Sequence, residues 1–320
     1  MPATTKFEVK LGAATREAFG RVLVELGREN SDIVVCDADL SKSTMTVYFQ
    51  KEFPERFFSF GIAEANMVAA GCGMAYAGKI PFVSSFSAFV INKGFEQLRV
   101  AAAYPNVNLK VVGTHSGISI GEDGPSQMSV EEIGLACSLP NFVVIAPADE
   151  ASTQALVRAA AAHVGPVFIR TGRPKCPIIY SGDQKFEIGK SIQVVEGKDV
   201  TVIANGLLVA QSILAAEALE AEGISVRVID LHTVKPIDRD AITRAAIETG
   251  AIVVAEEHLV DGGTGVRVAQ VVAETHPAPM EFVGIHDTYA ESGQPDELLS
   301  KYGLVAGDVA AAVRKVVARK

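Results

Sequence analysis

Residues 61–78 read Gly-Ile-Ala-Glu-Ala-Asn-Met-Val-Ala-Ala-Gly-Cys-Gly-Met-Ala-Tyr-Ala-Gly, and Glu64 is the only charged residue among them. Small and apolar side chains would cover every side of a helix formed by this stretch, so we expect it to be buried all round. A buried carboxylate needs partners or a proton, and desolvation raises its pKa toward the range where it can act at neutral pH. Glu64 is therefore the first functional candidate. The alternative is a first-turn glutamate that the helix dipole favours.

Strand-like and helix-like runs alternate on both sides of this stretch, which is the pattern of a mainly parallel α/β sheet. Residues 171–192 are rich in Gly and Pro with little periodicity, and we interpret them as a linker. The sequence thus predicts an α/β fold of two doubly wound domains, residues 1–180 with the linker and residues 181–320. The expected strands are 33–36, 81–84, 109–113, 142–145, 167–170, 200–204, 224–229, 251–255 and 281–285. The expected helices are 15–30, 62–77, 88–103, 131–138, 149–163, 208–222, 238–249, one after 263 and one ending at 319.

The composition excludes several classes of protein. The chain has 320 residues, 48% of them hydrophobic, and a formal net charge of −9 without a basic block, so nucleic acid is not an expected partner. No apolar run has the length and character of a membrane span, and residues 1–10 lack an apolar signal core. The four cysteines are widely spaced without a Cys-x-x-Cys pair, which is typical of structural thiols in a reducing compartment. We expect a soluble cytoplasmic protein that does not bind membranes.

Two motif matches lack the context that their chemistry needs. Residues 73–79 imitate a phosphate-binding P-loop, but Ile80 replaces the required Ser or Thr, and a helix would end there rather than begin. Gly78 is better explained as a helix C-cap. Residues 117–121 match the Gly-x-Ser-x-Gly nucleophile elbow, yet the Glu-Asp-Gly-Pro run that follows is turn chemistry, not a helix. A serine hydrolase using Ser119 stays as an alternative of a different enzyme class.

Two further segments follow expected strands, where ligands bind in parallel sheets. The loop of residues 114–128 brings together three glycines and the side chains of His115, Glu122, Asp123 and Gln127, although a solvated connection is the plainer interpretation. The run Ser85-Phe-Ser-Ala-Phe89 places two aromatic rings three residues apart, which could stack on a flat ring or simply fill the core.

Taken together, these segments resemble transketolase. The resemblance covers nearly the whole chain and corresponds to the C-terminal half of the full-length enzyme. It implies a pyrimidine-binding domain over residues 1–180 and a transketolase C-terminal domain over residues 181–320. The matching segments are Phe60-Gly-Ile-Ala-Glu-Ala-Asn-Met67, Ser85-Phe-Ser-Ala-Phe89, Gly113-Thr-His-Ser-Gly-Ile-Ser-Ile-Gly-Glu-Asp-Gly-Pro-Ser-Gln-Met128 and Phe168-Ile-Arg-Thr-Gly-Arg-Pro174.

The resemblance implies a thiamine diphosphate site. Glu64 would contact N1′ of the thiamine aminopyrimidine and favour the imino tautomer that removes the C2 proton of the thiazolium. Phe86 and Phe89 would hold the pyrimidine ring, and Asp39 would lie close to the thiazolium and the donor sugar. Low-dielectric surroundings strengthen the hydrogen bond that this role asks of Glu64.

The resemblance also implies a sugar phosphate substrate. Asp123 would hold a hydroxyl of the donor sugar, while Ser43, His115 and Arg170 match positions that hold the substrate phosphate. A guanidinium beside imidazole and hydroxyl donors suits such an anion. Gln127 stands where many transketolases carry a proton-transferring His and vertebrate-type enzymes carry Gln, so we assign it hydrogen bonding only.

One segment of the family is missing. Thiamine diphosphate enzymes bind the diphosphate and Mg²⁺ through a Gly-Asp-Gly segment with a later Asn, and no Gly-Asp-Gly occurs in this sequence. We therefore expect a split transketolase in which an N-terminal subunit binds the diphosphate and makes most of the contacts to Mg²⁺. The two kinds of subunit would form an α2β2 heterotetramer. The expected reaction moves a two-carbon ketol unit from a ketose phosphate to an aldose phosphate, as in the pentose phosphate pathway.

Two alternatives remain for the chemistry. The chain could be the β subunit of another thiamine diphosphate enzyme, a 2-oxo acid dehydrogenase or a deoxyxylulose phosphate synthase. It could also be an inactive transketolase-like binding subunit, although it retains Glu64, His115, Asp123 and Arg170 together.

Overall fold

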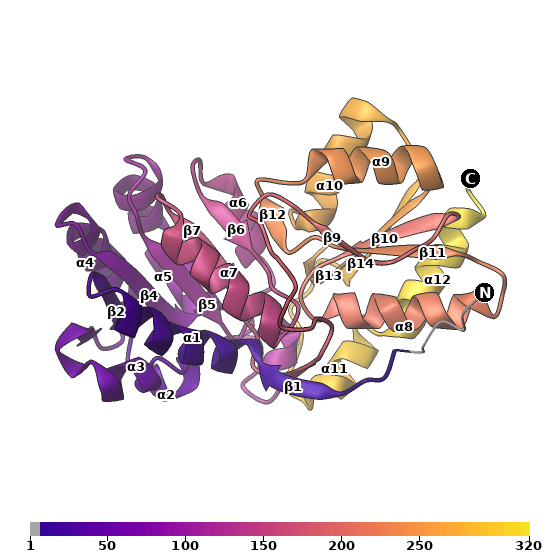
Figure 1. The fold of residues 1–320 in the computed structure, drawn as a ribbon. Helices are drawn as coiled ribbons and strands as arrows, with labels where there is room; N and C mark the ends of the chain where they lie inside the picture. Colours follow the sequence, from indigo (N-terminus) through magenta and orange to yellow (C-terminus); the bar gives the residue numbers. More distant parts are fainter. Residues whose placement is uncertain (1–6) are drawn as a thin grey trace.

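The computed structural model describes residues 7–320 as two α/β lobes that lie side by side (Figure 1). The first six residues, which belong to the predicted first domain and to the segment without a signal core, lie outside the described residues. The first lobe contains the helices α1 (Thr15–Glu29), α2 (Ser41–Thr44), α3 (Val47–Glu52), α4 (Glu64–Tyr76), α5 (Ser87–Gln97), α6 (Glu132–Ser138) and α7 (Glu150–Ala162). The second contains α8 (Leu208–Glu220), α9 (Arg239–Thr249), α10 (Thr264–Thr275), α11 (Pro295–Lys301) and α12 (Ala306–Val317).

The first lobe is built on a seven-stranded sheet in the order β12-β6-β7-β5-β4-β2-β3, parallel except for β12. Helices α1 and α7 cover one face through one apolar cluster, and α4, α5 and α6 cover the other through a second cluster. Because both faces are covered, the central strands are buried along their length, as continuous apolar runs predict. The strands are β2 (Ile33–Asp37), β3 (Phe57–Ser59), β4 (Ile80–Phe86), β5 (Lys110–Thr114), β6 (Val143–Ile145), β7 (Val167–Arg170) and β12 (Thr233–Lys235).

The second lobe repeats this architecture on a five-stranded sheet in the order β14-β13-β10-β11-β9, in which only β9 is antiparallel. Helices α8 and α12 pack on one face and α9 and α10 on the other. The strands are β9 (Ile192–Val195), β10 (Val200–Ala204), β11 (Val226–Asp230), β13 (Ile252–Leu259) and β14 (Met280–Ile285). The prediction of two doubly wound domains is confirmed.

Two short strand pairings are not revealed by the sequence. Strand β12 follows β11 of the second lobe in the chain but pairs with β6 of the first sheet. Within the predicted linker, β8 (Lys175–Pro177) pairs with β1 (Leu11–Ala14) in a small antiparallel ribbon. The linker is therefore partly ordered as a strand, and residues from the second half of the chain complete the first sheet.

Helix α4 differs from expectation in one respect. It forms where predicted, but it is not buried all round, because Asn66, Ala69, Gly73 and Tyr76 are exposed. These residues are spaced three and four apart, so they form one stripe along the helix. The opposite side packs on the sheet through buried Met67, Val68 and Cys72. The helix therefore has one side packed on the sheet and a second side, formed by the exposed stripe, that nothing in the described residues covers.

The two rejected motifs behave as the sequence predicts. Helix α4 ends at Tyr76, and Gly78 has a φ of +87° before β4 begins, so this turn closes a helix. Ser119 is fully buried in a 3-10 turn over Ile118–Ile120, without the strand–turn–helix geometry of a nucleophile elbow. Among residues 7–320, no helix has the length and apolar character needed to cross a lipid bilayer.

Candidate active site

The candidate residues gather at the carboxyl edge of the first sheet. Neighbouring parallel strands β2, β4 and β5 end at Asp37, Phe86 and Thr114, and loops leave all three at the same edge. In open α/β sheets this edge is where ligands bind. The fold therefore brings together segments that lie far apart in the sequence.

Glu64 is the first residue of α4, and only 2% of it is exposed. Its place in the first turn agrees with the helix-dipole interpretation, and its burial agrees with the functional one. The carboxylate is paired, because the Lys93 ammonium on α5 lies 3.1 Å from Oε1 and 3.3 Å from Oε2. A buried acid at this edge therefore faces a cation that is half-exposed.

The two phenylalanines form a stacked pair beside Glu64. The rings of Phe86 and Phe89 lie 5.5 Å apart at an interplanar angle of 16°. The Lys93 ammonium sits 4.4 Å from the centre of the Phe89 ring while it contacts Glu64. The carboxylate and the aromatic face thus point at one common position, which the ammonium occupies.

His115 continues this arrangement on the far side of Phe86. Its ring stacks on Phe86 with the centroids 3.9 Å apart. Arg16 Nη1 lies 3.0 Å from His115 Nε2, and Thr114 Oγ1 lies 2.9 Å from Nδ1. Because a guanidinium can only donate, Nε2 must accept, which leaves the proton on Nδ1. Burial, together with the cations Arg16 and Arg173, lowers the pKa of His115 to about 3, so the imidazole is neutral.

A cationic group surrounds His115. Arg16, in the first turn of α1, donates to the Ser43 carbonyl oxygen at 2.8 Å as well as to His115. Arg173 follows β7, and its charge contributes to lowering the pKa of both Arg16 and His115. Arg173 also donates to the Ile120 carbonyl and, at 2.8 Å, to Glu122. Two guanidinium groups with a neutral imidazole suit an anion.

Arg170 ends β7 at the same sheet edge, but its side chain is engaged inside the protein. It is the last residue of β7 and is buried, with Nε 2.6 Å from Glu132 Oε1 and Nη2 3.5 Å from Glu257 Oε2. Its guanidinium is therefore engaged by two carboxylates inside the protein. This geometry does not support the expectation that Arg170 holds a substrate phosphate. Arg173 lies three residues later, past the end of the strand.

The remaining predicted residues lie on the loops of this edge. Asp39 is exposed with a φ of +64°, directly after β2. The turn that carries Asp39 and Ser43 is fixed by buried Asp37, which accepts from the Leu40 amide at 2.6 Å and from Thr44 and Thr46 at 2.7 and 2.9 Å.

Asp123 and Gln127 lie on the loop after β5. Asp123 is exposed, and its charge acts to raise the pKa of Arg16, which burial lowers overall. The backbone amide of Gln127 donates to the Gly124 carbonyl at 3.1 Å, which closes the turn from Gly124 to Gln127. The loop thus carries an exposed carboxylate whose charge acts on the Arg16 guanidinium.

Sequence reasoning missed Arg16, Arg173 and Lys93. Arg16 begins the first helix immediately after a strand, and a basic residue at that position is a signal that could have been used. Arg173 lies within the quoted Arg-Thr-Gly-Arg-Pro run. The strand ends at Arg170, so Arg173 lies beyond the sheet, and the sequence alone did not show where the strand would end. Lys93 carries no motif, because its contact with Glu64 depends on how α4 and α5 pack.

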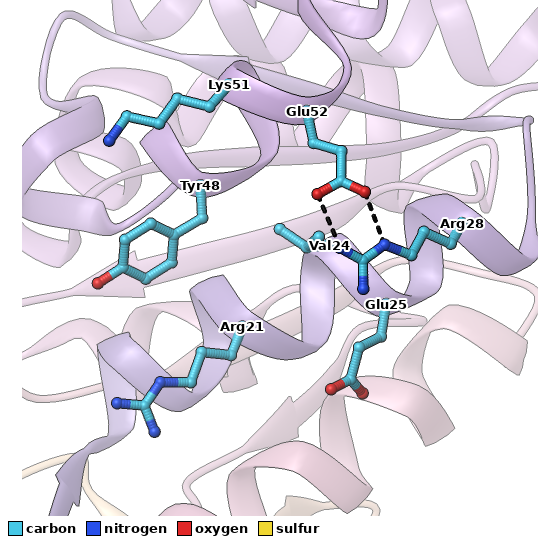
Figure 2. Close-up of a pocket in the computed structure, with 7 residues that line it drawn as sticks. All are labelled: Arg21, Val24, Glu25, Arg28, Tyr48, Lys51 and Glu52. Carbon is cyan, nitrogen blue, oxygen red and sulfur yellow. Dashed lines mark hydrogen bonds and ion pairs between the residues drawn. The ribbon is translucent and has the colours of Figure 1, made fainter.

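Two hollows on the described surface lie apart from these residues. One, of about 410 Å³, lies between α1 and α3 and is lined by Arg21, Tyr48 and the bidentate pair of Arg28 with Glu52 (Figure 2). The other, of about 720 Å³, lies against α8, β9 and β11. In residues 7–320 no three His, Cys, Asp or Glu side chains are grouped so as to hold a metal ion. The candidate residues line neither of these two hollows.

Comparison with known proteins gives a consistent result. The family model of the transketolase pyrimidine binding domain matches residues 12–178, and that of the transketolase C-terminal domain matches residues 189–309. A Methanocaldococcus jannaschii protein described as a transketolase C-terminal section is 43% identical over 298 residues, covering 92% of this chain and 93% of that protein. A 6-deoxy-6-sulfo-D-fructose transketolase subunit of a Clostridium species is 38% identical over 98% of both chains.

Solved structures agree with the sequence relatives. A structure described as a split gene transketolase, inactive beta4 tetramer, superposes with a TM-score of 0.90 at 49% identity, covering 96% of this chain and 99% of that one. By contrast, this chain spans 51% of human transketolase, to which it is 38% identical. The chain is thus similar in length to relatives described as sections or subunits, and to half of a longer one.

Proposed function

The chain belongs to the transketolase family, and on this premise we propose that it is the C-terminal subunit of a split, thiamine diphosphate-dependent transketolase. Its activity would be transfer of a two-carbon ketol unit from a ketose phosphate to an aldose phosphate. The observation that carries the proposal is the shared position faced by the Glu64 carboxylate and the Phe89 ring, next to the group of Arg16, His115 and Arg173. The domain boundary would lie near residue 180.

The described residues fit the aminopyrimidine end of the cofactor. The flat pyrimidine ring needs an aromatic surface, and its N1′ atom needs a carboxyl group. Phe89 and Glu64 supply these two groups, and both face the same position. Glu64 would hold the proton at N1′, and Lys93 would leave the position it occupies. When bound, thiamine diphosphate supplies the carbon nucleophile and electron sink of the reaction. Asp39 would lie toward the thiazolium side.

The substrate phosphate would meet the cationic group. Arg16 and Arg173 supply guanidinium donors, and His115 supplies a neutral imidazole, with Ser43 beside them. Asp123 would accept a hydrogen bond from a sugar hydroxyl, and Gln127 would donate or accept one. A carboxylate for hydroxyls next to cations for an anion suits a phosphorylated sugar better than an unphosphorylated 2-oxo acid.

A sulfonated sugar is a second candidate for the donor. The Clostridium relative is described as a 6-deoxy-6-sulfo-D-fructose transketolase subunit. Like a phosphate, a sulfonate is an anion with several oxygens that can accept hydrogen bonds from two guanidinium groups. The cationic group of this chain would serve either anion. Assays with both donors would separate them.

The diphosphate and Mg²⁺ would be held mainly by an N-terminal transketolase subunit, because no Gly-Asp-Gly segment occurs in this sequence. The exposed stripe of α4 begins beside Glu64 and offers a small-residue surface for that partner. We propose an α2β2 heterotetramer that works in pentose phosphate metabolism in the cytoplasm. Relatives of matching length described as a section, a subunit or a split transketolase support this arrangement.

The test is reconstitution with that partner subunit. The purified chain alone should show no ketol transfer, and the partner with thiamine diphosphate and Mg²⁺ should restore it. Glu64→Gln should lower turnover of the complex by about 100-fold or more, within the range of general acid–base catalysis, while size-exclusion chromatography shows unchanged assembly. Substantial transfer by the chain alone would contradict the split, and carbon dioxide release from 2-oxo acids would favour a dehydrogenase.

A further inference from the structure

The loop of residues 115–128, which carries His115, Asp123 and Gln127, is held from outside its own lobe. The end of strand β13 in the second lobe contacts this loop, and so does the segment that leads into α11. The second lobe contributes none of the residues that we assign to cofactor or substrate. Its contacts with this loop therefore suggest another way in which it could matter to the reaction.

Glu257 makes the central contact. Its Oε1 accepts from the Ser119 backbone amide at 2.7 Å, and only 2% of the residue is exposed. A Cβ on Gly117 would overlap the Glu257 carboxylate, so the turn is held against this side chain with no room between them. The carboxylate thus fixes the turn of residues 117–121 through the loop backbone.

The same strand anchors the regions on both sides of the loop. Arg170 Nη2 donates to the Glu257 carbonyl at 2.8 Å, and the Leu259 amide donates to the Val130 carbonyl at 2.8 Å. On the other side, Gln294 donates to Glu122 at 3.3 Å, and a Cβ on Gly121 would contact Pro295 at 3.0 Å. The loop is therefore clamped between β13 and the start of α11.

The neighbouring glutamate shows that this orientation is specific. Glu256 points to the opposite side of β13 and accepts from the Thr264 and Gly265 amides at 2.8 Å, which caps α10 within the second lobe. Successive residues of a strand face opposite sides, so the Glu256 carboxylate makes its contacts within the second lobe and the Glu257 carboxylate makes its contact with the first lobe.

We propose that Glu257 is a positioning residue through which the C-terminal domain sets the geometry of the substrate-binding loop. Loss of the Ser119 contact would release the turn of residues 117–121, and with it the placement of His115 and Asp123. Glu64 and Phe89 lie on other elements and would keep their places, whereas Phe86 stacks on His115, so the cofactor seat would change less than the substrate-binding loop. The consequence for catalysis rests on the proposed function, whereas the structural part stands without it.

Hydrogen exchange on the chain tests the structural part. Glu257→Leu should reduce the protection of the Ser119 amide by about tenfold or more, because its acceptor is removed. Glu257→Asp should do the same, since the shorter side chain keeps a charge for Arg170 but withdraws from Ser119. Glu257→Gln keeps the acceptor and should preserve protection within about threefold. The matched control, Glu256→Leu, should expose the amides of residues 264–265 and leave Ser119 protected.

Kinetics of the reconstituted complex test the catalytic part. Glu257→Asp should raise KM for the phosphorylated donor about tenfold while the Kd for thiamine diphosphate changes by less than about threefold, and Glu257→Gln should restore most of the loss in KM. An unchanged Ser119 amide, or a released loop with an unchanged KM, would overturn the proposal. A wild-type complex without ketol transfer would refute the proposed function, and the exchange data alone would then decide whether Glu257 holds the loop.

Discussion

Lys93 and the proposed cofactor share the position in front of the Phe89 ring. The ammonium contacts both oxygens of Glu64, and 48% of the lysine side chain is exposed. A charge-assisted hydrogen bond with this exposure is worth about 1 kcal/mol, so displacing it should cost the cofactor about fivefold in affinity. Lys93→Met should therefore tighten thiamine diphosphate binding to the reconstituted complex by about that factor, as measured by isothermal titration calorimetry. Lys93→Arg is the matched control, and weaker binding by the Met variant would show instead that Lys93 contacts the bound cofactor.

Arg170 and Arg173 are three residues apart but should respond differently to substitution. Arg173→Ala should raise KM for the phosphorylated donor about tenfold or more with little change in stability, because the side chain is 35% exposed at the sheet edge. Arg170→Ala leaves Glu132 and Glu257 as buried carboxylates without their cation, and should lower the free energy of unfolding by about 3–5 kcal/mol. Urea unfolding and steady-state kinetics measure the two effects. The reverse pattern would return the phosphate role to Arg170.

His115 gives the site a pH dependence whose sign is fixed by its environment. Its pKa of about 3 in the folded chain lies below the ordinary value of an unfolded histidine, about 6.5. As the pH falls below that ordinary value, the unfolded chain binds a proton that the folded chain does not, so this residue makes the fold less stable toward acid. His115→Gln should therefore flatten the loss of unfolding free energy between about pH 6.5 and 4 relative to wild type. An NMR titration that finds an imidazole pKa near 6.5 would contradict the assignment.

At the scale of the element, α4 has one face packed on the sheet and one exposed face, which we assign to the proposed partner subunit. Ala69 and Gly73 are exposed on the second face, between Asn66 and Tyr76. A large charged side chain there would prevent close approach of another subunit and leave a charge desolvated at the contact. Gly73→Glu should thus block assembly with the N-terminal subunit, seen as loss of the complex in analytical ultracentrifugation. Lys79→Glu, just beyond the helix, is the control that should assemble normally, and an intact Gly73→Glu complex would move the interface elsewhere.

The long elements could be predicted because their patterns are local. Mostly apolar runs such as Ile33–Cys36 and Val200–Ala204 indicate strands buried on both faces, and the structure has strands over both, with β2 one residue longer, to Asp37. The three-residue strands β8 and β12 could not be predicted, since their pairing with β1 and β6 is decided by tertiary contacts. The same limit applies to the site. Glu64 and Phe89 stand out in the sequence, but Lys93 enters the site only through the packing of α5 on α4.

At the scale of the whole molecule, the two lobes are joined by more than a linker. Strand β12 completes the first sheet from the second half of the chain, and Arg170 bridges Glu132 of α6 to Glu257 of β13 inside the protein. Because separating the lobes would expose these buried charges and an unpaired sheet edge, we expect them to unfold together. Differential scanning calorimetry should show one transition, with calorimetric and van't Hoff enthalpies that agree. Arg170→Ala should move that single transition to lower temperature or split it. Two separate transitions in the wild type would mean instead that the lobes fold independently. The contact between Glu257 and the loop would then be too weak to couple them.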